Sequence, residues 1–294
     1  MKLLITGATG LLGSKLVEDA LANGHDVISL CNEHPIVRGD VLRVDLRRAE
    51  EVRKALVKTK PDAVIHTASI TDVDLCERNP TLAMDTNGKA TGTIAQACSE
   101  LNSFLVYVST DYVFDGLTGS YKEENRTNPI NVYGSSKLLG EQLTSNLARD
   151  SCIARTSVIF GWGREYRPNF ATWLLGKLLT GQNVQIINGQ YASPTLNTCL
   201  ARMLLEVTVK RITGILHVAG AERVNRYEFA LRLAREFGYD PKLLVPTTPD
   251  SSNWYAKRPN DSSLNVEKGI RLLDVKPCSV DEELRAFKLE REEK

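Results

Sequence analysis

The chain of 294 residues carries 37 Lys and Arg against 36 Asp and Glu, a formal net charge of +1 at pH 7. This length is enough to bury a continuous apolar core, and the balanced charge excludes a global field that attracts nucleic acid or an anionic membrane. No apolar run approaches the roughly 20 residues that span a bilayer. The opening MKLLITGATGLLG also lacks the longer apolar stretch of a signal peptide. We expect a cytoplasmic protein with no nucleic-acid or membrane partner.

The six cysteines lie far apart and form neither a CxxC pair nor a cluster with histidine. Their distribution predicts no disulfide framework and no metal site. We interpret them as buried thiols in a reducing cytosol. They are Cys31, Cys76, Cys98, Cys152, Cys199 and Cys278.

The first half of the chain alternates short β-rich runs with helix-length amphipathic stretches, which predicts an α/β fold with a doubly wound parallel sheet. Strands are expected at Lys2–Thr6, Asp26–Leu30, Val41–Asp45, Ala63–Thr67, Phe104–Ser109 and Cys152–Thr156. Helices are expected at Leu12–Ala22, Ala49–Lys58, Leu82–Leu101 and Val132–Arg149. Because such sheets bind ligands outside the carboxyl ends of their strands, the loops that follow the strands are where function is expected.

After about residue 158 the alternation loosens, which predicts a smaller appended region. The run GILHVAG at 214–220 resembles one more strand of the sheet, and Phe170–Leu179 and Tyr227–Phe237 are expected to be helices. The charged tail at 281–294 is amphipathic, and we interpret it as a solvated terminal helix. The predicted division is a dinucleotide-binding domain of residues 1–157, joined by 190–220, and a discontinuous substrate-binding region of residues 158–189 and 221–294.

The segment TGATGLLG follows the first strand and opens a predicted helix, with glycines at three-residue intervals. Glycine there permits a positive φ and lets the backbone approach a pyrophosphate, whose charge the free N–H groups of the helix can meet. A glycine triplet alone could also be a tight turn, but the strand-to-helix context favours a dinucleotide. The residues expected to contact the cofactor are Gly7, Thr9, Gly10, Leu11, Leu12 and Gly13.

The end of the second strand bears on the choice of coenzyme. Dinucleotide sites of this type often place a carboxylate there to hold the ribose 2′-OH, whereas this chain has Leu30, Cys31 and Asn32. The missing acid removes a repulsion against a 2′-phosphate, and Arg38 is the nearest loop cation, so NADP(H) is favoured over NAD(H). Asp45 and Leu46 are expected to touch the adenine, although Asp45 could equally be the N-cap of the next helix.

The strongest catalytic signal is YGSSK, in which Tyr133 and Lys137 lie one helical turn apart and share a face. Hydride transfer to a ketone leaves an alkoxide that needs a proton. A tyrosine with a pKa near ~10 serves better when a neighbouring cation favours its phenolate. A hydroxyl of Ser109 or Thr110, at the end of the fifth strand, would hydrogen-bond the same carbonyl oxygen. The pattern predicts an oxidoreductase.

Together, TGATGLLG, STDYVFDG and YGSSKLLGE resemble the extended short-chain dehydrogenase/reductases. More narrowly, TDVDLCE, NPINVYGSSKLLGE, SPT at 193–195, GILHVAG and KRPNDSSLNVEK resemble the dTDP-4-dehydrorhamnose reductase family, over residues 1 to about 268. The resemblance implies that NAD(P)H reduces the 4-keto group of dTDP-4-dehydro-L-rhamnose to give dTDP-L-rhamnose. The implied partner is a nucleotide-diphosphate sugar.

By position, the resemblance implies roles for particular residues. Thr110 would bind the carbonyl, Tyr133 would donate the proton, and Lys137 would assist it and hold the nicotinamide ribose. Asp111 would contact substrate, and Asn87 would support the active-site lysine. The residues that would line the cofactor cleft are Ala68, Ser69 and Thr71.

Two features of the substrate side leave alternatives open. Val158 stands where these reductases often carry a tryptophan that packs on the sugar, so Trp162 either replaces that contact or plugs the core. Arg258, with Lys257, either binds the substrate diphosphate or is a solvated loop residue.

Two other functions remain open. The methionine adenosyltransferase β subunit, a regulatory protein, resembles the same family. A nucleotide-sugar epimerase or dehydratase is a further alternative, although dehydratases usually carry an Asp-Glu pair where this chain has Asp111 followed by Tyr112. The apolar helix stripes at 82–101 and 132–149 predict either a homodimer face or packing on the sheet.

Overall fold

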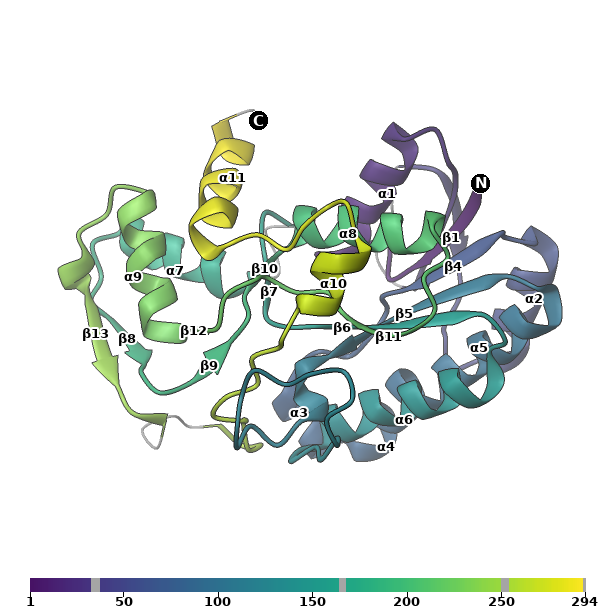
Figure 1. The fold of residues 1–294 in the computed structure, drawn as a ribbon, viewed down its shortest axis with the longest axis horizontal. Helices are drawn as coiled ribbons and strands as arrows, with labels where there is room; N and C mark the ends of the chain where they lie inside the picture. The colour runs from purple at the N-terminus through teal and green to yellow at the C-terminus, as the bar shows by residue number, and fades with distance from the viewer. Residues whose placement is uncertain (33–37, 164–167, 250–253, 293–294) are drawn as a thin grey trace.

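The computed structural model describes residues 1–32, 38–163, 168–249 and 254–292. Its centre is a seven-stranded parallel sheet in the order β11-β6-β5-β4-β1-β2-β3 (Figure 1). The strands are β1 Lys2–Thr6, β2 Asp26–Cys31, β3 Asp40–Arg43, β4 Ala63–His66, β5 Phe104–Thr110, β6 Ser151–Thr156 and β11 Gly214–His217. The doubly wound parallel sheet predicted from sequence is confirmed. The strand order reverses between β1 and β4, which is where such sheets open a binding crevice.

Helices cover both faces of the sheet (Figure 1). Helices α1 (Gly13–Ala22) and α8 (Asn197–Val209) pack on one face, and α2 (Ala49–Thr59), α5 (Ala90–Leu101) and α6 (Val132–Leu147) lie on the other. The two-residue period of a strand explains both cores. In β1, Leu3 and Ile5 join the cluster beneath α1 and α8, whereas Leu4 joins the cluster beneath α2 and α5.

The helix predicted at 82–101 is interrupted in the structure. A short helix α4 (Pro80–Ala83) leads into a π-helical segment, Met84–Lys89, before α5 begins. Such segments often mark functional sites. Here it carries Asn87, whose Oδ1 accepts from the backbone N of Ile70 at 2.8 Å and whose Nδ2 donates to Ser136 Oγ at 3.0 Å. Asn87 therefore connects the loop after β4 with α6. On α6 it binds Ser136, the residue before Lys137, and not Lys137 itself.

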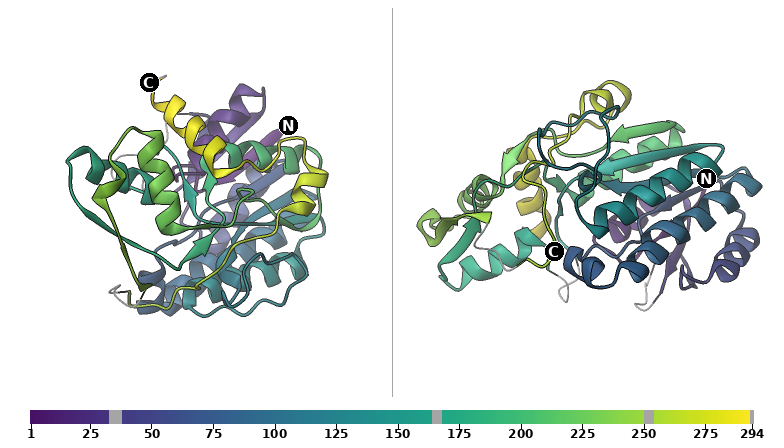
Figure 2. Two further views of the ribbon diagram at one scale, coloured as in Figure 1. Left: turned by 60° about the vertical axis from the view of Figure 1, so that its left-hand side comes forward. Right: turned by 90° about the horizontal axis from the view of Figure 1, so that it is seen from below.

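The second part of the molecule lies beside the carboxyl ends of the strands (Figures 1 and 2). Its strands form three separate pairs: β7 (Ile159–Phe160) with β10 (Thr195–Leu196), β8 (Val184–Ile187) with β13 (Leu244–Thr247), and β9 (Tyr191–Ala192) with β12 (Val224–Asn225). Its helices are α7 (Phe170–Leu179), α9 (Arg226–Glu236) and α11 (Val280–Glu292). The remaining helical segments are α3 (Val73–Arg78), α10 (Glu267–Leu272), and two 3-10 turns, Asp111–Val113 and Pro241–Leu243.

The C-terminal helix α11 is not a solvated appendage, so that expectation was wrong. Leu284 and Phe287 are buried and join the core of the second part. Trp162 stacks on Phe287 with ring centroids 4.4 Å apart, and its Nε1 donates to the Phe287 carbonyl at 2.6 Å. Trp162 therefore packs in the core of the second part. It does not replace the tryptophan that stacks on the sugar in the related reductases.

All six cysteines are free, and Cys31, Cys76, Cys98 and Cys152 are buried. Cys199 and Cys278 are only partly buried, which corrects the expectation that all six thiols lie inside. Within the described residues, no group of His, Cys, Asp and Glu side chains is arranged to hold a metal ion. No helix in that same part of the chain is both long and apolar enough to cross a bilayer.

Candidate active site

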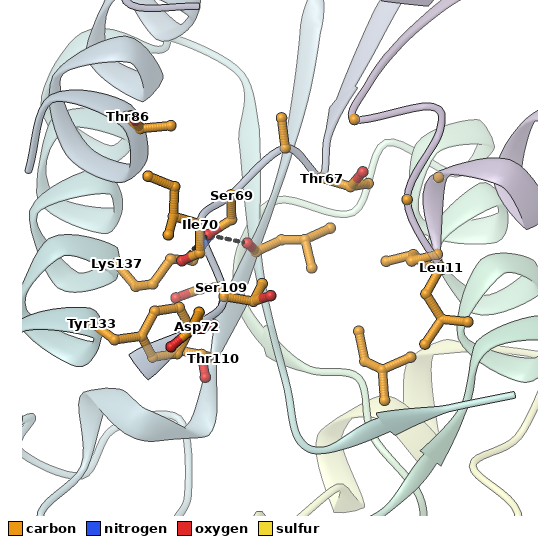
Figure 3. Close-up of a pocket in the computed structure, with 18 of the residues that line it drawn as sticks. Leu11, Thr67, Ser69, Ile70, Asp72, Thr86, Ser109, Thr110, Tyr133 and Lys137 are labelled. Carbon is orange, nitrogen blue, oxygen red and sulfur yellow. Dashed lines mark hydrogen bonds between the residues drawn. The ribbon is translucent and has the colours of Figure 1, made fainter. Parts of the chain in front are cut away.

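A cleft of about 970 Å³ opens at the carboxyl ends of β1, β4 and β5, between the glycine loop and α6 (Figure 3). Leu11 lies on one side of it, and Tyr133 and Lys137 project from the opposite side (Figure 3). Arg38 and Arg258 do not line it. The residues singled out from the sequence that do line it are Gly7, Thr9, Gly10, Leu11, Leu12, Gly13, Asn32, Asp45, Leu46, Ala68, Ser69, Thr71, Ser109, Thr110, Asp111, Tyr133, Lys137 and Val158.

The three glycines of the loop serve different purposes. Gly7 has φ +63°, and a Cβ there would lie 2.8 Å from the backbone of Ala68. A Cβ on Gly13 would lie 2.1 Å from the Gly7 carbonyl oxygen, so this glycine allows the helix to pack on the loop. A Cβ on Gly10 would meet one atom within 4 Å, the Gly7 carbonyl oxygen at 3.1 Å, and Gly10 otherwise faces the cleft that it lines. Helix α1 begins at Gly13 without a capping side chain, so its first N–H groups suit an anion.

The loops after β2 and β3 also line the cleft, through Asn32, Asp45, Leu46 and Arg47. The Asp45 carboxylate accepts from Arg47 Nη2 at 2.6 Å and from the Arg47 backbone N at 3.0 Å. The hydrogen bond from the Arg47 side chain is the main cause of a lowered pKa at Asp45. Because α2 has no side-chain cap, Asp45 is not its N-cap.

The two cations in these loops differ in position. Arg38 forms an ion pair with Glu18 at 3.6 Å, and its side chain is 64% exposed. Arg47, which we did not single out from the sequence, lies in the wall of the cleft. The signal that could have found it is its place two residues after Asp45, in the loop that follows β3.

Helix α6 positions the tyrosine and the lysine. Its N-cap, Asn131, accepts from the backbone N of Gly134 at 2.8 Å. The Lys137 ammonium donates to the Val108 carbonyl at 2.8 Å and lies 4.4 Å from the centroid of the Tyr107 ring. Burial lowers the pKa of Lys137 to about 7, against the opposing effect of the Glu141 carboxylate. A backbone carbonyl near the end of β5 therefore holds the Lys137 ammonium in place.

Thr110 is the hydroxyl that meets the tyrosine. Burial raises the pKa of the Tyr133 phenol, and the neighbouring Thr110 hydroxyl opposes that rise. The neighbouring Ser109 instead donates to Glu141 Oε1 at 2.5 Å. The structure thus separates two hydroxyls that the sequence left as alternatives. A phenol with a raised pKa keeps its proton at neutral pH, as a proton donor must.

Asp111 is buried at the base of the cleft. Its carboxylate accepts from the hydroxyls of Thr110 at 3.1 Å, Ser157 at 2.8 Å and Ser262 at 2.5 Å. Burial raises its pKa to about 6, and these hydrogen bonds oppose the rise. The carboxylate joins the ends of β5 and β6 to the segment at Ser262, so it fixes the wall that holds Thr110.

A smaller cavity of about 320 Å³ is lined by Trp254, Tyr255, Lys257 and Arg258, among others. The Arg258 guanidinium pairs with Asp74 at 2.9 Å and donates to the Ala256 carbonyl at 2.8 Å. It therefore lies in a built pocket rather than in a solvated loop.

The parallel sheet, the glycine loop at its switch point and the Thr110, Tyr133 and Lys137 side chains define a short-chain dehydrogenase/reductase. The comparison with known families narrows this class, because residues 1–291 match the model of the RmlD substrate binding domain. The chain belongs to this family and is a dTDP-4-dehydrorhamnose reductase-like NAD(P)-dependent oxidoreductase.

Relatives with assigned roles match over almost the whole chain. The dTDP-4-dehydrorhamnose reductase of Aggregatibacter actinomycetemcomitans is 33% identical, with 94% of each chain covered. A probable low-salt glycan biosynthesis reductase of Haloferax volcanii is 32% identical, covering 98% of this chain and 97% of its own. Methionine adenosyltransferase 2 subunit beta of Danio rerio is 29% identical, covering 91% of this chain and 83% of its own.

Solved structures agree with these matches. A hypothetical dTDP-4-dehydrorhamnose reductase from Sulfolobus tokodaii has a TM-score of 0.86 and 38% identity, covering 95% of this chain and 97% of its own. The dTDP-4-dehydrorhamnose reductase of Bacillus anthracis, solved in complex with NADP, has a TM-score of 0.88 and 27% identity. The match covers 98% of this chain and 99% of that chain.

Proposed function

We propose that the protein reduces the 4-keto group of a nucleotide-linked deoxysugar with NAD(P)H, converting dTDP-4-dehydro-L-rhamnose to dTDP-L-rhamnose. The observation that carries this proposal is the cleft in which Thr110, Tyr133 and Lys137 lie together with the glycine loop. In this proposal residues 1–157 with 190–220 hold the dinucleotide, and residues 158–189 and 221–294 hold the sugar nucleotide. A cytoplasmic location and a homodimer remain predictions.

The reaction needs a hydride, a proton and a polarised carbonyl. The nicotinamide, when bound, supplies the hydride. On substrate binding, the Thr110 hydroxyl would turn from Asp111 to donate to the keto oxygen, and the Tyr133 phenol would give that oxygen a proton as negative charge develops. Lys137 places a cation beside the phenolate that remains and holds the nicotinamide ribose, while Asp111 holds Thr110 in position.

The chain's own groups fit a dinucleotide along the glycine loop. Space at Gly10 and the uncapped start of α1 suit a pyrophosphate, and Leu12, Ala68, Ser69 and Thr71 would complete the lining. For the preference of NADP(H) over NAD(H), the structure favours Arg47 over Arg38 as the cation for a 2′-phosphate, because Arg47 lines the cleft. Asn32, also in the lining, would face the same ribose without repelling the phosphate.

On the substrate side, Val158 is 42% exposed and lines the cleft near Asp111, so we place the deoxysugar against it. Arg258 and Lys257 in the smaller cavity would face the nucleotide part. A turnover assay with NADPH and a 4-keto nucleotide sugar tests the proposal. Loss of reduced-nicotinamide absorbance that depends on the sugar supports it, and no turnover with any such sugar contradicts it.

A second candidate function is a regulatory subunit, favoured by the likeness to methionine adenosyltransferase 2 subunit beta. Tight NADPH binding without turnover, together with recovery of a methionine adenosyltransferase from a cell extract, would support this alternative. Turnover with no such partner would support the reductase.

A further inference from the structure

Arg226 is a guanidinium held at the start of α9, in the second part of the molecule. The preceding residue, Asn225, caps the helix by accepting from the backbone N of Tyr227 at 2.9 Å. The Arg226 guanidinium lies 4.3 Å from the centroid of the Phe170 ring, and its Nη1 donates to Gln190 Oε1 at 3.1 Å. Two neighbours from separate segments thus fix the direction of this side chain.

Two other inward-facing arginines are neutralised by a carboxylate, whereas Arg226 is not. Arg155 pairs with Glu141 at 2.7 Å, and Arg258 pairs with Asp74 at 2.9 Å. Among the described residues, no carboxylate lies within 4.0 Å of the Arg226 guanidinium. Burial lowers its pKa, and the nearby like charge of Arg258 adds to that effect. A largely desolvated cation without a carboxylate is costly unless an anion compensates it.

Arg226 lines neither cavity itself, but its two partners come from segments that contribute to their walls. Gln190, its hydrogen-bond partner, lines the smaller cavity with Arg258. Phe170, its ring partner, follows Asn169, which lines the large cleft. Tyr112 also lines the large cleft, and the charges of both Arg258 and Arg226 act to lower the pKa of its phenol, which burial raises to about 12. Both guanidinium groups therefore lie close enough to Tyr112, in the wall of the large cleft, to affect its phenol.

We propose that Arg226 is a second anchor for the diphosphate of the sugar nucleotide, acting with Arg258 to select substrates that carry a diphosphate. This inference rests on the proposed function. A guanidinium has five N–H donors in a planar fork that matches phosphate oxygens, and the hydrogen bond to Gln190 uses one of them. Since Asp74 neutralises Arg258, Arg226 would add to Lys257 the positive charge that a diphosphate needs.

The test compares Arg226→Gln with the parent protein and with Arg235→Gln. Arg235 lies on the same helix but is exposed, so its substitution removes an equal charge away from both cavities. Calorimetry would measure the affinities for dTDP, UDP, thymidine and NADPH. We expect Arg226→Gln to weaken dTDP binding roughly 10- to 100-fold, because charge-assisted hydrogen bonds are lost. Thymidine and NADPH affinities should stay unchanged in both variants.

Arg226→Lys provides a second variant that keeps the charge but lacks the planar fork, and we expect an intermediate loss of dTDP affinity. In turnover, KM for the sugar nucleotide should rise more than kcat falls. If Arg226→Gln binds dTDP as the parent does while retaining NADPH, the inference is wrong and the proposed reduction is unaffected. If the parent binds neither nucleoside diphosphate, the proposed substrate class fails first, and the inference falls with it.

Discussion

Ser109 donates its hydroxyl hydrogen to Glu141 Oε1 over 2.5 Å, and the same carboxylate holds Arg155 at 2.7 Å. Ser109 lines the cleft, but its hydroxyl hydrogen is taken up by this buried network. The next residue, Thr110, faces the phenol instead. Both hydroxyls line the cleft, so their hydrogen-bond partners separate them: Ser109 is bound to a buried carboxylate, and Thr110 lies beside the phenol.

The first prediction follows from this division. Thr110→Val should slow turnover because the keto oxygen loses its hydrogen-bond donor, whereas Ser109→Ala should leave turnover near the parent value. Ser109→Ala should instead lower the free energy of unfolding by about 1 kcal/mol, the net contribution of one hydrogen bond. Steady-state kinetics and urea unfolding of both variants check this. A larger kinetic loss in Ser109→Ala than in Thr110→Val would reverse the assignment.

Tyr133→Phe should remove the proton donor while keeping the ring and the helix. We expect kcat to fall by about 10²–10⁴-fold, as for loss of general acid catalysis, with unchanged NADPH affinity. Thr110→Val should cost less than this. Lys137→Ala should also weaken NADPH binding, because the proposed function has the ammonium hold the nicotinamide ribose. Turnover of Tyr133→Phe within about threefold of the parent would mean that the proton comes from another group.

The glycine loop offers a matched pair of substitutions. Gly10→Val should prevent dinucleotide binding but preserve the fold, because the space beside Gly10 lies on the cleft side. Gly13→Ala should lower stability, because the new Cβ would lie 2.1 Å from the Gly7 carbonyl oxygen. Calorimetry with NADPH and thermal unfolding separate the two effects. Unchanged cofactor affinity in Gly10→Val would remove the loop from the site.

Coenzyme preference should depend on Arg47. Arg47→Gln should weaken NADPH binding about tenfold, as expected for a lost charge-assisted contact, with little change for NADH. Arg38→Gln serves as the control, since Arg38 lies outside the cleft lining. Asn32→Asp should shift preference toward NADH, because a carboxylate accepts from the 2′-OH and repels a 2′-phosphate. Equal losses for both coenzymes in Arg47→Gln would contradict this assignment.

His66 predicts how stability depends on pH. It is buried between the hydroxyls of Thr6 at 2.6 Å and Thr91 at 3.0 Å, and burial lowers its pKa from 6.5 to about 3. Below pH 6.5 the unfolded chain binds a proton that the folded chain does not. Stability is therefore lost as the pH falls from 6.5 toward 3, by at most ~1.4 kcal/mol per pH unit from this group.

The check is urea unfolding between pH 5 and 7, a window chosen to precede most carboxyl titration. His66→Asn should be less stable at neutral pH but should show a shallower decline with acid. His25→Asn, at a partly exposed position, should change the slope less. Parallel curves for the parent and His66→Asn would show that His66 does not cause the decline.

Local sequence patterns were sufficient to predict most of the central sheet and the pairing of Tyr133 with Lys137. Alternating β-rich and amphipathic runs placed the six strands within two residues of their observed ends, and the four-residue spacing put Tyr133 and Lys137 on one face of α6. These inferences depend on the period of a helix or strand, which the neighbouring residues set. The π-helical segment at Asn87 escaped prediction because its contacts come from Ile70 and Ser136, which lie 17 and 49 residues away.

The sequence by itself determined the class of sheet, the dinucleotide loop and the helical pairing of Tyr133 with Lys137, because each is written in a short run of residues. Only the tertiary structure paired Ser109 with Glu141, placed Arg47 rather than Arg38 in the cleft wall, and put Trp162 in the core. Trp162 meets Phe287 across 125 positions of the chain. Such contacts depend on how remote segments pack together, and no local periodicity encodes them.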